Sequence, residues 1–265
     1  MKLIIYFILT VISILGLIWS VGTNGPWEEI FIGLLTACAL FIVDSLIEDW
    51  PNLFLYIQSI LRFRKILIRL SVSYLFRIQL DDKYLLIRSD RFPQQFIPVG
   101  GVYKRLPQSH TFFAGIKARS DDKIILDSVS RNDLRIRLFG LYIPKFINWF
   151  SRGKGRELSP WREFYEELVE PGILSKKVFP YIFYNHVRTH VNGIKYSEHF
   201  ECYELLIADI FELVPTKDQE KELRILMDKI DDRYIWVDAS TIQTLGVIPQ
   251  KSRKYIISNH SPWIL

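Results

Sequence analysis

The sequence is poor in cysteine: Cys38 and Cys202 are the only two in 265 residues. Two thiols cannot form the disulfide framework that stabilises small secreted domains, which agrees with a cytosolic location for most of the chain. Cysteine and histidine also never recur at the spacing of a structural zinc site. Since His186, His190 and His199 cluster only loosely and without cysteine or acidic partners at helical spacing, we interpret them as ordinary polar positions.

The sequence also lacks internal repeats, low-complexity tracts and a large net charge. The formal charge of +5 is too small by itself to indicate nucleic-acid binding. The charge is unevenly placed, because residues 104–156 contain twelve Lys or Arg against four Asp. This segment is therefore basic, whereas the remainder of the chain is slightly acidic.

Charged residues are nearly absent from the first 47 positions, where two apolar runs follow each other. Leu3 to Val21 is uncharged and long enough to cross about 30 Å of hydrocarbon, and a second run spans Ile30 to Ile47. A signal peptide is the alternative, since Lys2 precedes the first run, but no small-x-small cleavage site follows cleanly. The pattern favours a transmembrane helical hairpin over residues 1–49.

The turn between the two runs, residues 22–29, contains no basic residue, whereas four basic residues occur between Arg62 and Arg69. The positive-inside rule therefore predicts that both chain ends are cytoplasmic. Residues 50–70 alternate apolar and basic positions, which is typical of an amphipathic linker helix on the membrane surface or docked on the next domain. We place the boundary of the following domain, residues 71–265, near Leu70.

Small residues recur at helical spacing in both predicted membrane helices. Gly16 and Ser20 form one small-xxx-small pair, and Gly33 and Ala37 form another. These pairs serve either the packing of one hairpin or the assembly of several hairpins into an oligomer with a polar seam. Asp44 either faces a partner or water within the membrane, or lies at headgroup depth with no further role.

The remainder of the chain alternates strand and helix patterns, which predicts an α/β domain. A hairpin is expected at residues 74–89, turning at Asp81-Asp82, and a short strand leads through Pro98 into the double glycine Gly100-Gly101. Further strands are expected at residues 123–126, 134–138, 179–186 and 200–208, and an apolar helix at 143–150. A charged helix is expected at 217–228, with Gln219 exposed, and a last strand and helix at 234–246.

Three carboxylates, Glu163, Glu166 and Glu167, follow Ser159-Pro160, which has the chemistry of a helix start. Offsets of zero, three and four place them on one helix face, where like charges repel each other. The face is either simply solvated or neutralised by a hard cation such as Mg²⁺ or by arginines such as Arg162.

The strand, the double glycine and the helix with Arg-Glu-x-x-Glu-Glu together resemble the Nudix domain, whose pattern is G-x5-E-x7-R-E-U-x-E-E-x-G-U with U bulky and apolar. Gly101 matches the first glycine, Arg162 and Glu163 match R-E, Phe164 matches U, and Glu166 and Glu167 match E-E. The resemblance implies an α/β/α sandwich and, in an active enzyme, Mg²⁺ held by Glu163, Glu166 and Glu167.

The sequence departs from this pattern at several points. About sixty residues separate Gly101 from Arg162 because a basic insertion occupies about 104–159, and Lys154 stands where the family has its first glutamate. The nearest substitute is Glu157, in a different register, and the motif is also too long after Glu167. These departures argue against hydrolysis more than against the fold.

The basic insertion offers groups that suit a nucleotide. Arginine binds phosphate in a bidentate manner, and aromatic rings stack on bases. The candidate ligand-binding residues are Arg135, Arg137, Arg152, Arg156 and Trp149.

The chain as a whole resembles the SMODS-associated Nudix proteins, the transmembrane Nudix effectors of CBASS anti-phage systems. The resemblance implies a sensor of a cyclic oligonucleotide made by a partner nucleotidyltransferase, which assembles as a homo-oligomer and disrupts the bacterial inner membrane. The alternatives are an active membrane-bound Nudix hydrolase of nucleoside diphosphate derivatives and a structural membrane scaffold.

Overall fold

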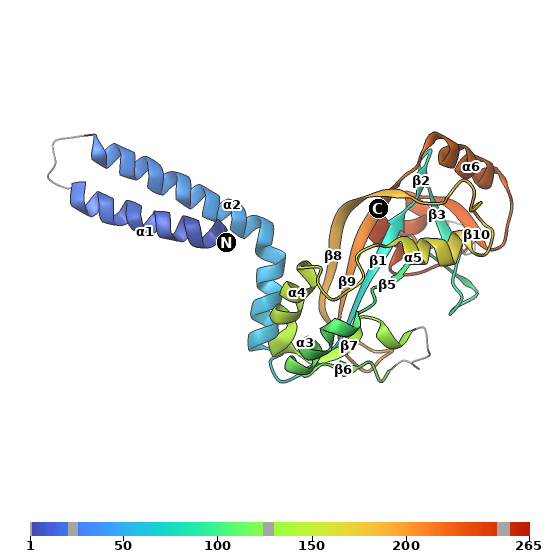
Figure 1. Cartoon of the computed structure of the whole chain (residues 1–265), viewed down its shortest axis with the longest axis horizontal. Coiled ribbons are helices and arrows are strands. Elements are labelled where there is room, and N and C mark those ends of the chain that lie inside the picture. Colours follow the sequence, from blue (N-terminus) through green and yellow to red (C-terminus); the bar gives the residue numbers. More distant parts are fainter. Residues whose placement is uncertain (1, 21–25, 124–129, 248–254) are drawn as a thin grey trace. The chain divides into compact units, whose positions relative to one another are not determined.

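The computed structural model describes the backbone of residues 2–20, 26–123, 130–247 and 255–265 (Figure 1). The chain divides into two compact units, Met1–Arg62 and Phe63–Leu265. The expected boundary near Leu70 lies inside the first strand of the second unit, which begins at Leu67.

The N-terminal unit is a pair of helices, α1 (Lys2–Ser20) and α2 (Trp27–Leu61), as the two apolar runs predict. The second helix extends well beyond the expected end of the hairpin at residue 49. The separate linker helix predicted for residues 50–70 is therefore absent from this described part of the chain, because its first half continues α2 and its last residues belong to a strand. Within the described residues, the structure has no helix that combines the length and the apolar content needed to cross a bilayer.

Small residues of α1 form the contact between the two helices. Ser13 and Ser20 are buried, and a Cβ added at Gly16 would overlap the ring of Phe31. The hydroxyl of Ser13 donates to the carbonyl of Leu9 in its own helix. Gly16 thus lies in close contact with Phe31 of α2 within the hairpin.

The second small pair lies elsewhere on the hairpin. Gly33 and Ala37 are exposed, and a Cβ at Gly33 would meet no atom within 4 Å. The side chain of Asp44 lies outside the described residues. The face of α2 around Gly33 is therefore open to a further helix.

The second unit is built on a six-stranded sheet in the order β6-β7-β1-β9-β8. The sixth strand, β5, pairs with β1 on the same edge as β7 but further along the strand. The central strand β1 runs parallel to β9 and antiparallel to β7 and β5. The bounds are β1 Leu67–Arg77, β5 Gly100–Val102, β6 Arg119–Ser120, β7 Arg135–Phe139, β8 Phe183–Ser197 and β9 Cys202–Val214. The predicted insertion is thus partly a component of the main sheet, through β6 and β7.

A smaller sheet has the order β10-β3-β4-β11, with β2 pairing β3. Its bounds are β2 Gln79–Leu80, β3 Lys83–Arg88, β4 Gln95–Ile97, β10 Tyr234–Asp238 and β11 Ile256–Ile257. Asp81 and Asp82 both have positive φ, the conformation of a two-residue hairpin turn, which confirms the predicted turn. Apolar residues of both sheets, including Leu75, Leu86 and Ile210, form a shared core.

The helices of this unit are short. They are α3 His110–Gly115, α4 Ile143–Ser151, α5 Trp161–Phe164, α6 Lys217–Asp228 and α7 Ala239–Gln243, with single-turn helices at Pro107–Ser109, Ser130–Asn132, Gly140–Tyr142 and Ser261–Ile264. The predicted strand 134–138, the helix 143–150 and the charged helix 217–228 are confirmed. Most of the strand expected at 123–126 lies outside the described residues.

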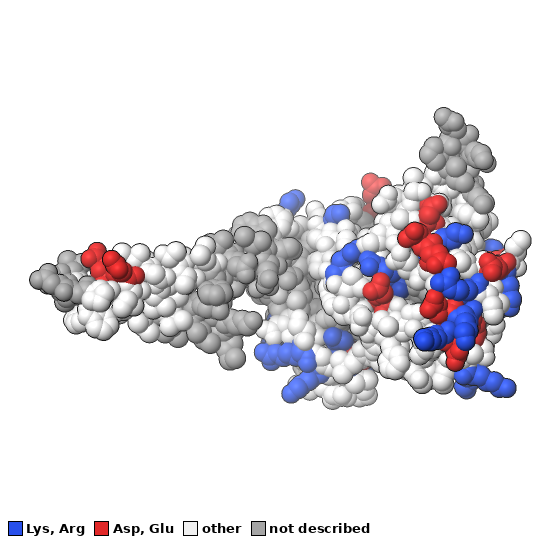
Figure 2. All heavy atoms as spheres, turned by 90° about the horizontal axis from the view of Figure 1, so that it is seen from above, with Lys and Arg blue, Asp and Glu red and all other residues white. Residues whose placement is uncertain are grey.

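The helix α6 corrects one expectation. Gln219 is buried rather than exposed, because its side chain closes a capping box with Thr216 and donates to the carbonyls of Val178 and Tyr181. Elsewhere on this helix Arg224 bridges Asp81 and Glu220. Figure 2 shows acidic and basic side chains interspersed on the displayed face of the second unit, so this face carries no broad patch of one sign.

The glutamate segment and Arg69 lie on opposite faces of the main sheet, as the alternation of side chains along β1 shows. Successive side chains of a strand point to opposite faces, and β1 pairs with β9 without a bulge from Arg69 to Arg77. Tyr74 and Phe76 therefore share one face, and Arg69 and Leu75 share the other. The glutamate segment packs on the first face, whereas the second carries the shared core at one end and Arg69 at the other.

Candidate functional site

The segment with the three glutamates is a short helix whose second turn is a π-helix. The α5 turn begins at Trp161, whose amide donates to the hydroxyl of Ser159, close to the predicted start. The π-turn covers Tyr165–Val169, and the amide of Glu170 bonds the carbonyl of Tyr165. Single π-turns often mark functional sites, and this one changes the α-helical spacing that the sequence predicts for the glutamates.

Phe164, the apolar residue of the motif, anchors this segment. Its side chain is fully buried and packs edge-on against Phe76 of β1, with ring centroids 5.4 Å apart, and against Phe179 at 5.9 Å. Leu168 is also fully buried. Burying this apolar side against the sheet directs the polar side toward β5 and the double glycine.

The double glycine lies directly against the glutamates. The amide of Gly100 donates to Oε2 of Glu167 at 2.8 Å, and the φ of Gly100 is +147°, in the region that favours glycine. A Cβ at Gly101 would overlap the carboxylate of Glu163. The structure thus brings together Gly101, Glu163 and Glu167, as the motif predicts, because only residues without a side chain leave room for this approach.

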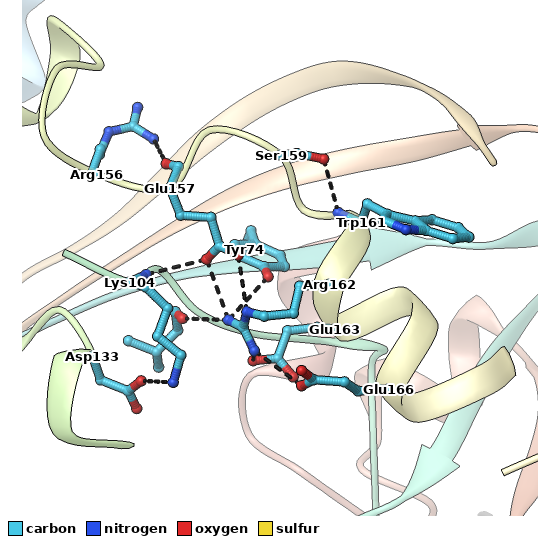
Figure 3. Close-up of polar contacts among 11 residues, drawn as sticks. Tyr74, Lys104, Asp133, Arg156, Glu157, Ser159, Trp161, Arg162, Glu163 and Glu166 are labelled. Atoms are coloured by element: carbon cyan, nitrogen blue, oxygen red, sulfur yellow. Dashed lines mark hydrogen bonds and ion pairs between the residues drawn. The ribbon is translucent and has the colours of Figure 1, made fainter. Parts of the chain in front are cut away.

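Arg162 lies between the carboxylates (Figure 3). Its Nε donates to Oε1 of Glu157 at 2.9 Å, and its Nη1 donates to Glu163 at 2.7 Å and to Glu166 at 3.1 Å. Nη2 contacts the carbonyl of Val102 at 3.2 Å. One guanidinium therefore binds three carboxylates and offsets part of their mutual repulsion, which is the second of the two ways of offsetting it that the sequence offers.

Glu157 completes this network from the basic loop before the helix. Its Oε2 accepts from the amide of Lys104 at 3.2 Å in addition to Arg162. The sequence offers Glu157 as the nearest substitute for the family's first glutamate, but in a different register. The tertiary structure places it beside Arg162, so its role here is to bind the arginine.

Burial and charge shift the pKa values of this cluster. Burial raises the pKa of Glu163, opposed by the adjacent Arg162 charge, and it raises the pKa of Glu167 well above its usual range. Burial alone would lower the pKa of Arg162, but the hydrogen bond to Glu157 and the charge of Glu163 raise it above its ordinary value. Burial, followed by the charge of Glu157, raises the pKa of Tyr74 beneath the arginine. Arg162 is accordingly a permanent cation within the cluster.

The three glutamates do not fit a magnesium site as they are arranged. Among the described residues, no group of three His, Cys, Asp or Glu side chains is placed to hold a metal ion. The guanidinium of Arg162 occupies the point on which Glu163 and Glu166 converge, and Glu167 turns away to the amide of Gly100. Mg²⁺ needs several oxygen ligands at about 2.1 Å, which this arrangement does not offer.

Two of the predicted ligand residues, Arg135 and Arg137, lie on the face of the main sheet opposite the glutamates. Arg137 of β7 pairs in register with Arg69, so it lies on the sheet face opposite Tyr74 and Arg162. Arg135 shares the face of Arg137, two residues away, and bridges Asp133.

The other predicted ligand residues lie around α4. Arg156 donates to the carbonyl of Phe150, and its guanidinium covers the ring of Phe150 at 3.8 Å. Trp149 stacks on Phe112 with centroids 4.9 Å apart, and Arg152 is exposed. Arg156 and Trp149 thus have structural contacts that the sequence pattern does not reveal.

Comparison with known families identifies the second unit. The model of the SMODS-associated NUDIX domain matches residues 67–265, from the first residue of β1 to the C-terminus. The chain belongs to the SMODS-associated Nudix family. A search of curated proteins finds no match. The family model thus covers the α/β unit of this SMODS-associated Nudix protein, while the helical hairpin lies outside the matched range.

Two further groups of this Nudix domain are not singled out by the sequence. Tyr103 donates to the buried carboxylate of Asp209 at 2.7 Å, and Thr189 donates to the other oxygen at 2.6 Å. Arg69 is buried on the opposite face between Asp121 and Glu204. No motif in the sequence marks either group. The only signal is that two consecutive aspartates, Asp121 and Asp122, occur within an otherwise basic segment.

Glu167 should give the Nudix domain a distinctive pH dependence. A carboxyl whose pKa is raised on folding stabilises the fold below its unfolded pKa of about 4.3, and this advantage is lost as pH rises toward the folded pKa. Glu167→Gln removes the ionisation while its carbonyl can still accept from Gly100. We expect the melting temperature of the variant minus that of the wild type to increase between pH 4 and 8.

Each pKa unit corresponds to about 1.4 kcal/mol, or about 3–6 °C in Tm for a domain of this size. Differential scanning fluorimetry across this pH range measures the effect. The exposed Glu170, replaced by Gln, serves as the control on the same segment. A difference that stays flat or declines with pH would contradict the raised pKa.

Proposed function

We propose that this SMODS-associated Nudix protein senses a cyclic oligonucleotide through its Nudix domain and disrupts the inner membrane through its helical hairpin. The observation that favours this proposal over a metal-dependent hydrolase is the position of Arg162. In a metal-dependent hydrolase the glutamates must be free to hold a cation, whereas here Glu163 and Glu166 are bound by the guanidinium of Arg162. The acidic helix then acts as a structural clamp on the double-glycine turn.

The hairpin supports the membrane part of the proposal through its surface. Large apolar side chains are exposed on both helices, among them Ile18 at 67%, Trp19 at 63% and Leu40 at 66%. Glu28 and Glu29 are the only charged residues in the ranges 9–20 and 26–40. Contiguous exposed apolar surface of this kind favours contact with lipid or with further hairpins. A messenger that binds the assembled state better than the separate state would drive assembly by its differential affinity.

The biological setting of the proposal comes from the family. A partner nucleotidyltransferase would make the messenger during phage infection, and the protein would be an effector at the bacterial inner membrane with both chain ends in the cytoplasm. Loss of the membrane barrier would then stop phage propagation by killing the infected cell.

The alternative function is a membrane-bound Nudix hydrolase of nucleoside diphosphate derivatives. Its supporting observation is that carboxylate oxygens of Glu163 and Glu166 both lie within 3.1 Å of one nitrogen of Arg162. If Arg162 were displaced on substrate binding, a cation could take its place and polarise a phosphoryl oxygen.

Calorimetry and product analysis on the detergent-solubilised full chain separate the two functions. We expect a cyclic di- or trinucleotide to bind with a micromolar or lower Kd, and no turnover of nucleoside diphosphate derivatives in the presence of Mg²⁺. Glu166→Gln should leave binding unchanged, because Glu166 is the most exposed of the carboxylates that bind Arg162. Mg²⁺-dependent hydrolysis that disappears in Glu166→Gln would instead establish the enzyme.

A further inference from the structure

Three arginines form a row across the end of the six-stranded sheet. Arg119 of β6 pairs directly with Arg137 of β7, and Arg137 pairs directly with Arg69 of β1. Directly paired residues point to the same face, so the three guanidinium groups project from one side of the sheet. Like charges directly opposite each other on neighbouring strands are unfavourable, and the row therefore requires anions.

Two consecutive aspartates after β6 supply most of the negative charge. The Nε of Arg69 donates to Asp121 at 2.8 Å, and its Nη1 donates to Glu204 at 3.1 Å. Arg137 donates to both carboxylate oxygens of Asp122 through Nη1. Two neighbouring arginines of the row are thus each held by one of two consecutive aspartates.

The two ion pairs differ in how firmly they are built. The side chain of Asp121 is fully buried and that of Arg69 is 5% exposed, which makes this pair part of the core. Asp122 is 66% exposed, and both of its oxygens bind a single nitrogen of Arg137. The Nε of Arg137 is buried and has no hydrogen-bond partner among the described groups. The guanidinium of Arg137 thus uses only part of its hydrogen-bonding capacity. Its partner Asp122 is exposed, so another anion can replace it more easily than it can replace Asp121 on Arg69.

Aromatic rings accompany the row. The guanidinium carbon of Arg69 lies 4.0 Å from the ring centre of Phe200, and that of Arg119 lies 5.9 Å from the ring centre of Phe139. Phe139 is two residues from Arg137 and projects to the same face of the sheet. Guanidinium groups interleaved with rings suit a ligand that combines phosphates with flat bases.

We propose that Arg119 and Arg137 of this row form the phosphodiester-binding site of the domain beside the buried Arg69–Asp121 pair, and that Asp122 occupies the site until a nucleotide displaces it from Arg137. This inference rests on the proposed sensing function and gives it a location on the face opposite the glutamates. Arg69 comes only seven residues after Arg62, the last residue of the N-terminal unit. The row therefore lies close in sequence to the junction between the two units.

Isothermal titration of the full chain with a panel of cyclic di- and trinucleotides, a linear dinucleotide and inorganic pyrophosphate tests the site. Asp122→Asn should raise the affinity for the bound nucleotide about tenfold, because the internal competitor loses its charge. Arg137→Gln should lower it at least tenfold. Arg119→Gln, at an exposed edge position, should lower it as well and provides a variant that does not disturb the core.

The matched control is Asp231→Asn. Asp231 also forms an arginine pair, with Arg233, through which its pKa falls to about 2, but this pair lies away from the row. If the wild type binds a cyclic oligonucleotide and Asp122→Asn, Arg137→Gln and Arg119→Gln all bind it like Asp231→Asn, the proposed location of the site is wrong while the sensing function stands.

The remaining outcomes are equally decisive. If no cyclic oligonucleotide binds, yet pyrophosphate or the linear dinucleotide binds Asp122→Asn at least tenfold better than the wild type, the anion site stands and the sensing function falls. If no probe binds any variant, both are overturned.

Discussion

Replacing Arg162 by alanine is expected to destabilise the Nudix domain by about 3 kcal/mol, the lower end of the cost of removing one partner from a buried charge cluster. The lower end applies because 24% of the Arg162 side chain is exposed, so water partly compensates for the loss. The physical reason is that Glu157, Glu163 and Glu166 would repel each other in a partly desolvated site. The expected change in Tm is a decrease of about 6–12 °C.

Arg162→Lys is the informative companion. Lysine retains the charge but not the planar fork, and therefore cannot bind Glu157, Glu163 and Val102 at once. It should recover part of the lost stability. A Tm of Arg162→Ala equal to that of the wild type would show that the cluster is simply solvated, as the first interpretation of the glutamate face has it.

Mg²⁺ extends this test to the alternative function. If Glu163 and Glu166 can accept a cation once the guanidinium is gone, millimolar Mg²⁺ should raise the Tm of Arg162→Ala but not that of the wild type. No difference between the two is expected if Glu167 stays bound to Gly100, because too few ligands then remain.

The second large effect is expected at Gly33. A Cβ at Gly33 meets no atom within 4 Å, so a leucine there should leave the packing of α1 against α2 intact while preventing the close approach of a further helix. In vesicles that contain the full chain and the messenger, we expect Gly33→Leu to reduce dye leakage at least tenfold. Cross-linking should show the corresponding loss of oligomers.

Two companions separate assembly from folding of the hairpin. Gly16→Leu would overlap Phe31 and should disrupt the hairpin itself, visible as loss of helix in circular dichroism. Ile32→Leu changes an exposed apolar neighbour of Gly33 with little change in volume and should leave leakage intact. Undiminished leakage from Gly33→Leu would exclude close packing of α2 in the assembly.

Much of the local structure is predictable from the sequence because it depends on neighbours in the chain. Asp81-Asp82 favours a two-residue turn, and alternation over residues 134–138 predicts β7. The motif likewise predicts that the glutamates meet the double glycine. Each of these signals lies within a few residues or in a known pattern of residue types.

Boundaries and partners are less predictable. The amphipathic pattern of residues 50–70 suggests one helix, but residues 67–70 belong to β1, which pairs with β7 from Leu67 and with β9 from Arg69. Similarly, Arg135, Arg137 and Arg156 look equivalent in a basic segment. Their partners differ because two lie on a strand and the third lies over the aromatic rings near α4.

The amino-acid sequence by itself predicts a helical hairpin, an α/β domain with the remains of a Nudix motif, and a basic insertion. It does so through periodicity, turn chemistry and charge balance, which act over short distances. The tertiary structure alone decides that Arg162 occupies the glutamate cluster and that Arg137 faces the other way with Asp122. Such pairings depend on strand register and on which face a side chain takes, because a shift of a single residue in a strand reverses the direction of every side chain.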